Sequence, residues 1–292
     1  RLADRLTAIN GAREERNRLE VKKLNEIVGP VVGAIDYDRD VRSVSWAARG
    51  GSVPERHIMC ALARRIRDIE PEAERAVRLI EEKLGITVAG SARERLLDPD
   101  NPHVLYDTLG VFKAELVPRV FVQPDERECP PVEEITAFGV RIGAIPAYAY
   151  LGDVGESPTG DKKAQRFEDA YLDQLFARLT DLGFRAVTYM PPRNTRDQLA
   201  RVQALCSDHG LMEISGVDIN SSRQDFRCAE VRQPEFRGLI ESTWALVGHE
   251  ELTRDDRDAG LFGTTGAVNT APLPERIAYY ARVGRASTPA GT

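Results

Sequence analysis

Three strand-like runs in the second half of the chain each end in a polar, turn-prone cluster, and helical patterns separate them. The runs cover residues 143–153, 184–195 and 211–224. This alternation predicts a β-α-β-α-β unit in which the strands are parallel and point the same way. Because ligands of parallel α/β sheets and barrels bind outside the carboxyl ends of the strands, we expect the three polar ends to meet at one binding edge.

Composition restricts the class of protein. The length of 292 residues allows one large α/β domain or two smaller ones. A formal net charge of −6 argues against nucleic acid as the main partner, because binding a phosphate backbone requires a basic surface. No apolar run approaches the ~20 residues that span a bilayer, and no signal peptide is visible. These features predict a cytoplasmic protein without a membrane partner, and they leave open whether it forms a homo-oligomer.

The cysteines do not indicate a zinc site. The sequence has no CxxC pair, and its four cysteines lie far apart, at Cys60, Cys129, Cys206 and Cys228. This spacing predicts reduced thiols, some of them in the core.

Residues 1–130 are predicted to form a mostly helical insertion or cap. A helix over 1–29 is expected to stop at Gly29-Pro30, and Ser52 has the spacing of an N-cap for the next helix. Further helices are predicted over residues 55–69, 71–85 and 104–117.

Residues 131–286 are predicted to form the β/α part of the chain, and 287–292 a flexible tail. The strands are expected over residues 143–150, 184–190 and 211–217. The helices are expected over residues 162–182, 195–209, 234–247 and 273–284, with Thr195 as the N-cap of the second.

Asp218 is the first candidate for a site residue, because it follows the apolar end of the third strand. A carboxylate there can ligate a metal, act as a base, or cap the following loop in an Asx-turn. Asn220 and Arg223 stand beside it and favour a functional role.

The ends of the first two strands supply further candidates. Tyr150 either lines the pocket or is a core aromatic residue, and Asp153 begins a long polar loop. Lys163 in that loop either meets an anion or is simply solvated. Arg193 and Asn194 follow a rigid double proline, and the guanidinium of Arg193 suits a phosphate, a carboxylate or an acidic neighbour.

Arg56 and His57 open a predicted helix after a Gly-Gly loop. Helix N-termini favour anions through free N–H groups and the helix dipole. A packed or capping histidine is the alternative interpretation of His57. No GxGxxG, Walker A, GxSxG or HExxH pattern occurs, and no nucleophile–histidine pair can be assigned.

The block from residue 145 to 225 resembles the last part of the PHP (polymerase and histidinol phosphatase) superfamily, and within it the branch of TrpH-like phosphoesterases. Members show an Ala-His-Pro triplet after one late strand and a Gly-Ser-Asp-x-His run after the last strand. An Arg-x-His-Ile element in their inserted helices is similar to residues 56–58. The resemblance covers about residues 13–250 and is strongest over 143–226.

This resemblance implies a distorted seven-stranded, TIM-like β/α barrel whose Mn, Fe or Zn ions hydrolyse phosphate esters. Asp218 matches the metal-binding aspartate of the last run. Asn220 and Tyr150 stand where the family has histidines, and an amide oxygen or a phenol is a poorer ligand for these ions than imidazole. The family's early motifs, namely His-x-His, Asp-His and a glutamate, do not occur. The chain therefore resembles the C-terminal two-thirds of such a protein, and we expect a segment before Arg1 or another chain to complete the barrel.

Three functions follow as hypotheses. The first is a PHP-type metal-dependent hydrolase of a phosphorylated small molecule, with Arg56, Lys163 and Arg193 holding the substrate anion. The second is a catalytically degenerate PHP-like module that binds or senses a ligand without hydrolysing it. The third is a metal-dependent sugar isomerase or lyase on a similar barrel, whose tyrosine- and asparagine-rich rim would suit polyol hydroxyls.

Overall fold

The computed structural model describes residues 2–155, 165–217, 219 and 221–287. The chain divides into two compact units. The first consists of Arg1–Pro130 together with Ser221–Arg223, and the second of Pro131–Asn220 and Gln224–Thr292. Of the predicted tail, residues 288–292 lie outside the described part.

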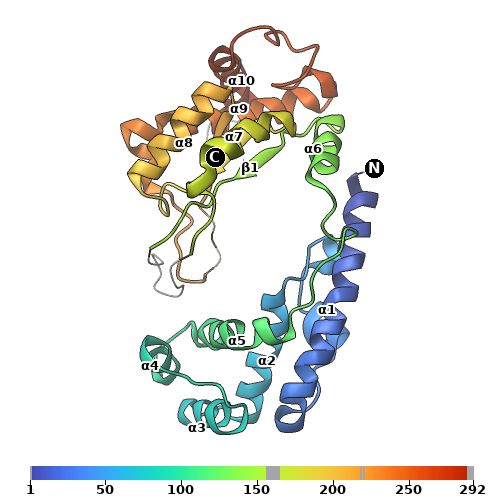
Figure 1. Cartoon of the computed structure of the whole chain (residues 1–292), viewed down its shortest axis with the longest axis vertical. Helices are drawn as coiled ribbons and strands as arrows, with labels where there is room; N and C mark the ends of the chain where they lie inside the picture. The colour runs from blue at the N-terminus through green and yellow to red at the C-terminus, as the bar shows by residue number, and fades with distance from the viewer. Residues whose placement is uncertain (1, 156–164, 218, 220, 288–292) are drawn as a thin grey trace. The chain divides into compact units, whose positions relative to one another are not determined.

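In its described residues the first unit consists of helices and connecting loops and has no strand. Its core is formed where α1, α2 and α5 pack together, and it includes Leu24, Val28, Leu62, Phe112 and Leu116 (Figure 1). The α-helices are α1 (Leu2–Val32), α2 (Glu55–Ile69), α3 (Ala73–Arg78), α4 (Gly90–Leu97) and α5 (Val104–Val120). Shorter π- and 3₁₀-helical segments are η1 (Tyr37–Arg42), η2 (Ala47–Arg49) and η3 (Leu79–Lys83).

The end of α1 differs from the sequence prediction. The helix does not stop at Gly29-Pro30 but runs through Pro30 to Val32. A proline this close to the C-terminus removes only one intrahelical hydrogen bond. The stop is Gly33, whose φ of 77° is the left-handed conformation that glycine adopts after a helix, and whose N–H donates to the Gly29 carbonyl at 3.0 Å.

The start of α2 also differs in detail. The helix begins at Glu55, as predicted, but its N-cap is Pro54 and no side chain caps it. The prediction that Ser52 caps this helix was therefore wrong. An extended proline at the cap position supplies the turn into the helix without a side-chain acceptor.

The second unit is built around a parallel sheet of order β1-β2-β3. Ala147 pairs with Ala186, and Val187 pairs with Glu213. The strands are β1 (Ala147–Ala149), β2 (Ala186–Tyr189) and β3 (Met212–Ser215). The α-helices are α6 (Val132–Arg141), α7 (Leu172–Asp181), α8 (Arg196–His209), α9 (Arg237–Thr253) and α10 (Leu273–Ser287). The 3₁₀ segments are η4 (Asp169–Tyr171), η5 (Ala229–Arg232), η6 (Pro234–Phe236) and η7 (Arg257–Ala259).

Alternation along the strands sends their side chains to two separate cores. Val187 and Tyr189 pack with the apolar residues of α7 and α8. Ala186 and Met212, on the other face, join the cluster that contains residues of α9 and α10. Helices therefore cover both faces of the described sheet (Figure 1), and the barrel implied by the family resemblance stays a prediction.

Local signals explain where α8 begins and ends. Thr195 caps it in a full capping box with Gln198, as the Thr195 prediction required. Gly210, with φ of 62°, ends it. The helix predicted over 162–182 is shorter, because α7 begins only at Leu172.

Candidate functional site

The carboxyl ends of β1 and β2 meet, and Asn194 joins them. Its amide nitrogen donates to the carbonyl of Leu151 at 2.7 Å, after β1. Its Oδ1 accepts from the backbone N–H of Met190 at 3.2 Å, at the end of β2. Asn194 is buried, so the structure gives this predicted site residue a positioning role between the two strand ends.

Tyr150 points its hydroxyl at Asp169. The distance from Tyr150 Oη to Asp169 Oδ1 is 2.6 Å, and Tyr150 is 1% exposed. Burial, followed by the contact with Asp169, raises the pKa of Tyr150 far above its usual range. At neutral pH the phenol is therefore a hydrogen-bond donor, and its oxygen is not a free anionic ligand.

Asp169 is the centre of this network, and the sequence analysis missed it. Besides Tyr150, it accepts at Oδ2 from Gln198 Nε2 at 2.7 Å and from the Asp153 N–H at 3.0 Å. Burial acts to raise the pKa of Asp169, but the hydrogen bonds from Tyr150 and Gln198 outweigh it and lower the pKa. Asp169 is thus an ionised carboxylate held by neutral donors.

Asp153 supports the base of the loop that follows β1. Its Oδ1 accepts from the Phe167 N–H at 2.6 Å. Directly beside it, Val154 and Gln165 exchange two backbone hydrogen bonds of 2.9 Å. The carboxylate that we predicted as a ligand-binding group therefore accepts a backbone hydrogen bond, while Lys163 of the same loop lies outside the described residues.

Glu168 also binds the carboxyl end of β1. It is 3% exposed, and its Oε1 accepts from the Leu151 N–H at 2.8 Å and from Tyr148 Oη at 3.3 Å. The sequence does not mark Glu168 and Asp169 as site residues. They lie between the polar loop after β1 and α7, outside both the strand-end clusters and the helical periodicity on which the predictions were based. Only Gln198 carried a local signal, through its capping-box spacing from Thr195.

Arg193, at the same edge, has a side-chain nitrogen whose hydrogen-bonding capacity no described residue uses. Its backbone N–H closes a turn onto Met190 at 2.8 Å, and its guanidinium carbon lies 5.6 Å from the ring centroid of Phe167. Among the described residues, its Nη1 is buried and has no hydrogen-bond partner. A buried N–H of a charged group without an acceptor is costly, which makes Arg193 the clearest candidate for holding an anion here.

The predicted site residues Arg56 and His57 belong to the first unit, in the first turn of α2. Burial lowers the pKa of His57, and the Pro54 carbonyl opposes this effect. His57 is therefore mainly neutral at neutral pH. The interpretation of this turn as an anion site stays a prediction.

Arg223 is engaged by an acidic residue. Its two terminal nitrogens each donate to Asp107 at 2.7 Å, in a bidentate pair. The two remaining candidates on this loop, Asp218 and Asn220, lie outside the described residues. Their predicted role as metal ligands therefore stays a prediction.

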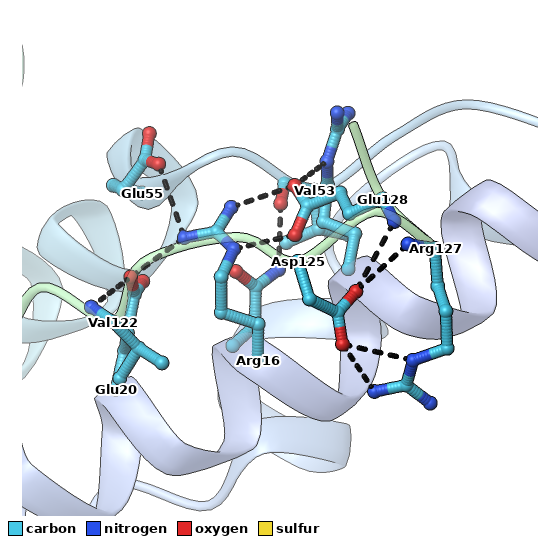
Figure 2. Close-up of polar contacts among 10 residues, drawn as sticks. Arg16, Glu20, Val53, Glu55, Val122, Asp125, Arg127 and Glu128 are labelled. Carbon is cyan, nitrogen blue, oxygen red and sulfur yellow. Dashed lines mark hydrogen bonds and ion pairs between the residues drawn. The ribbon is translucent and has the colours of Figure 1, made fainter. Parts of the chain in front are cut away.

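A second charged cluster, which the sequence analysis did not find, lies on α1 (Figure 2). Arg16 is 7% exposed and donates to Glu128 through two nitrogens, at 2.6 and 3.0 Å. It also donates to Glu20 at 2.6 Å and reaches Glu55 at 3.5 Å. One buried guanidinium thus forms ion pairs with three carboxylates, which come from α1, α2 and the segment after α5.

The other groups around Arg16 complete the cluster. Glu20 accepts from the Val122 N–H at 3.2 Å, and Arg13 donates to Glu128 at 2.8 Å. Burial raises the pKa of Glu20. Burial acts the same way on Glu128, but the hydrogen bonds from Arg16 and Arg13 prevail and lower its pKa. The cluster therefore holds the segment 122–128 against α1.

The described donors do not form a ligand set for the metal ions that the family resemblance implies. Tyr150 donates rather than accepts, and both oxygens of Asp169 accept hydrogen bonds from protein groups. Within residues 2–155, 165–217, 219 and 221–287, no three His, Cys, Asp or Glu side chains are grouped as a metal site. We therefore derive no chemical step through a metal ion.

Comparison with known proteins found no similar protein. No family model matches the chain, and no curated protein or solved structure shows significant similarity to it. In the described part of the chain, none of the helices combines the length and the apolar character needed to cross a bilayer.

Proposed function

We propose that this chain is a PHP-like phosphoesterase that binds a phosphorylated small molecule at the carboxyl edge of β1, β2 and β3. The observation that supports the proposal is Arg193, whose buried Nη1 has no acceptor among the described residues. Phosphate oxygens match the geometry of a guanidinium. A bound phosphate would supply the missing acceptor.

The position of Arg193 supports the same proposal. It follows β2, the central strand of the sheet, and ligands of parallel sheets bind at this end of the strands. Asn194, Asp169 and Gln198 fix the surrounding backbone, so Arg193 would be presented on a rigid edge. The requirement for Mn, Fe or Zn ions rests on the family resemblance and on Asp218 and Asn220.

The test uses the full chain, with p-nitrophenyl phosphate as a general phosphomonoester and inorganic phosphate as a binding probe. Turnover is measured with and without Mn²⁺, and the Kd for phosphate by calorimetry. Arg193→Gln should weaken phosphate binding about 10- to 100-fold, because one or two hydrogen bonds to a charged group are lost.

The matched control is Arg196→Gln. Arg196 lies near Arg193 in the sequence, but it is exposed and its guanidinium contacts Gln233 and Glu235. This control should bind phosphate as the wild type does. Equal phosphate affinity in Arg193→Gln and wild type, or no phosphate binding by the wild type, would remove the proposal.

One observation favours the second candidate function, a degenerate module that binds a ligand without hydrolysis. Tyr150 stands where the resemblance expects a histidine, and its hydroxyl is committed to Asp169 at 2.6 Å. Phosphate binding without turnover at any Mn²⁺ concentration would select this second function. Turnover that depends on Mn²⁺ would select the first.

A further inference from the structure

The guanidinium of Arg193 lies over the ring of Phe167. The guanidinium carbon is 5.6 Å from the ring centroid, within the ~6 Å over which the face of an aromatic ring attracts a cation. This contact uses none of the N–H groups of the guanidinium as hydrogen-bond donors. Within the described part of the chain, the buried Nη1 has no acceptor. Arg193 therefore keeps a donor for a ligand while the ring holds its charge.

The backbone that carries Phe167 is tied to the carboxyl end of β1. The Phe167 N–H donates to Asp153 Oδ1 at 2.6 Å. The next residue, Glu168, accepts at Oε1 from the Leu151 N–H at 2.8 Å. Asp169 accepts at Oδ2 from the Asp153 N–H at 3.0 Å. Three consecutive residues are thus hydrogen-bonded to the segment that follows β1, which fixes the place of the Phe167 ring.

The backbone that carries Arg193 is tied to the same segment. The Arg193 N–H donates to the Met190 carbonyl at 2.8 Å, and the next residue, Asn194, donates from Nδ2 to the Leu151 carbonyl at 2.7 Å. Leu151 therefore binds the neighbour of Phe167 through its N–H and the neighbour of Arg193 through its carbonyl. These two hydrogen bonds to one residue hold together the two backbones that carry the ring and the guanidinium.

A guanidinium that is held in advance binds an anion at a lower cost. An arginine side chain has several rotatable bonds, and fixing them when a ligand binds costs free energy. A ring that already restricts the guanidinium removes part of this cost before the ligand arrives. An aliphatic side chain of similar volume has no π face and cannot replace the ring in this role.

We propose that Phe167 is a positioning residue for anion binding at the carboxyl edge. Its ring orients the guanidinium of Arg193 and leaves Nη1 for an oxygen of the ligand. Phe167 itself makes no contact with the ligand in this proposal and acts through Arg193. The inference rests on the proposed function, because it concerns the same site.

The first experiment measures the Kd of inorganic phosphate by calorimetry for Phe167→Leu and Phe167→Tyr in the full chain. Phe167→Leu should weaken binding about three- to tenfold, because it removes the cation–π contact. Phe167→Tyr keeps the ring face and should bind phosphate more tightly than Phe167→Leu. A residue that only fills space would not show this order, since leucine also fills an apolar site.

The matched control is Phe138→Leu. Phe138 lies in α6 of the same unit, and the guanidinium of Arg141 lies over its ring at 5.2 Å from the centroid. The substitution therefore removes the same kind of contact away from the end of β2. Phe138→Leu should bind phosphate as the wild type does.

A double variant tests whether Phe167 acts through Arg193. In the Arg193→Gln background the guanidinium is absent, so the further change Phe167→Leu should leave the phosphate Kd as it is in Arg193→Gln alone. If the losses from the two substitutions simply add, the two residues act independently, and the positioning role is wrong.

A second measurement does not depend on ligand binding. An aromatic ring shifts the NMR resonances of protons that lie over its face. The Cδ protons of Arg193, assigned by their loss in Arg193→Gln, should move in Phe167→Leu toward the shift of an arginine without a ring contact. They should stay near the wild-type position in Phe167→Tyr.

The outcomes separate the two proposals. If the wild type does not bind phosphate, the proposed function fails, and the Arg193 resonances alone decide whether Phe167 orients the guanidinium. If the wild type binds phosphate and Phe167→Leu binds it equally well, the positioning role is wrong. Unmoved Arg193 resonances in Phe167→Leu would also overturn it.

Discussion

Arg16 in the first unit and Asp169 in the second unit are each the centre of a polar network, but their partners differ in charge. Arg16 is surrounded by the carboxylates of Glu20, Glu55 and Glu128. The carboxylate oxygens of Asp169 accept from neutral donors, namely a phenol, an amide and a backbone N–H, and the guanidinium of Arg201 binds only its backbone carbonyl. Loss of the central residue should therefore leave buried like charges in the first network and only unpaired neutral donors in the second.

The largest effect should come from Arg16→Met. The substitution leaves Glu20 buried without its counter-charge and leaves Glu128 with Arg13 alone, and removing one partner of a buried ion pair typically costs about 3–5 kcal/mol. Urea unfolding followed by circular dichroism measures the loss. Arg127→Met is the control, because Arg127 pairs with Glu15 and Asp125 at the surface, and its loss should not change the unfolding midpoint. A midpoint for Arg16→Met that equals that of the control would contradict our view of the cluster.

Asp169→Asn should have a smaller effect. The amide of the variant has one acceptor oxygen, and its NH₂ group faces donors that the second carboxylate oxygen of Asp169 accepted from. At least one buried donor therefore loses its acceptor, at a cost of about 1–3 kcal/mol. The same unfolding assay applies, with the exposed Asp173→Asn as control. If Asp169→Asn destabilised the chain as much as Arg16→Met, the contrast between charged and neutral networks would not hold.

The smallest effect should be a pH dependence from His249 in the second unit. Its Nδ1 accepts from the Leu261 N–H and its Nε2 lies 3.0 Å from the Gly143 carbonyl. These contacts fit a neutral imidazole, so folding stabilises the neutral form of His249. Burial lowers the pKa of His249 below the ordinary value of 6.5. The unfolded chain then binds the proton more readily, and this contribution to stability is complete above pH 6.5 and declines as the pH falls toward the folded-state pKa.

The measurement is the unfolding midpoint between pH 7.5 and 5.5 for the wild type and His249→Gln. The wild type should lose more stability over this range than the variant, because only the wild type titrates at this position. Parallel curves for the two proteins would show that His249 does not contribute.

The sequence predicted the elements whose signals are local. The limits of α2 at Glu55 and Ile69 and the Thr195 cap of α8 follow from helical periodicity and capping chemistry. The strands were predicted in the right places but too long. The residues at the ends of the predicted strands do not pair in the sheet, and those at the carboxyl ends form the loops of the binding edge. The helix predicted from residue 162 was wrong at its start, since Glu168 and Asp169 bind the end of β1 before α7 begins.

The contacts of the candidate site could not be predicted in the same way. Tyr150 was expected either to line a pocket or to be a core residue, and nothing local distinguishes these alternatives. Its partner, Asp169, is 19 positions away, and Arg16 and Glu128 are 112 positions apart. Pairs at such separations have no periodic signature, so one sequence reveals the charges but not their pairing.

Gln198 has a consequence for the choice of residue at its position. Its Oε1 accepts from the Thr195 N–H at 2.8 Å, which leaves Nε2 to donate to Asp169 and to the Asp153 carbonyl, at 2.7 and 2.8 Å. A glutamate could close the same capping box, yet it would bring a second negative oxygen against Asp169. Of the two residues that usually complete a capping box with threonine, glutamine and glutamate, only glutamine suits position 198. Its side chain must also donate a hydrogen bond to the negatively charged Asp169.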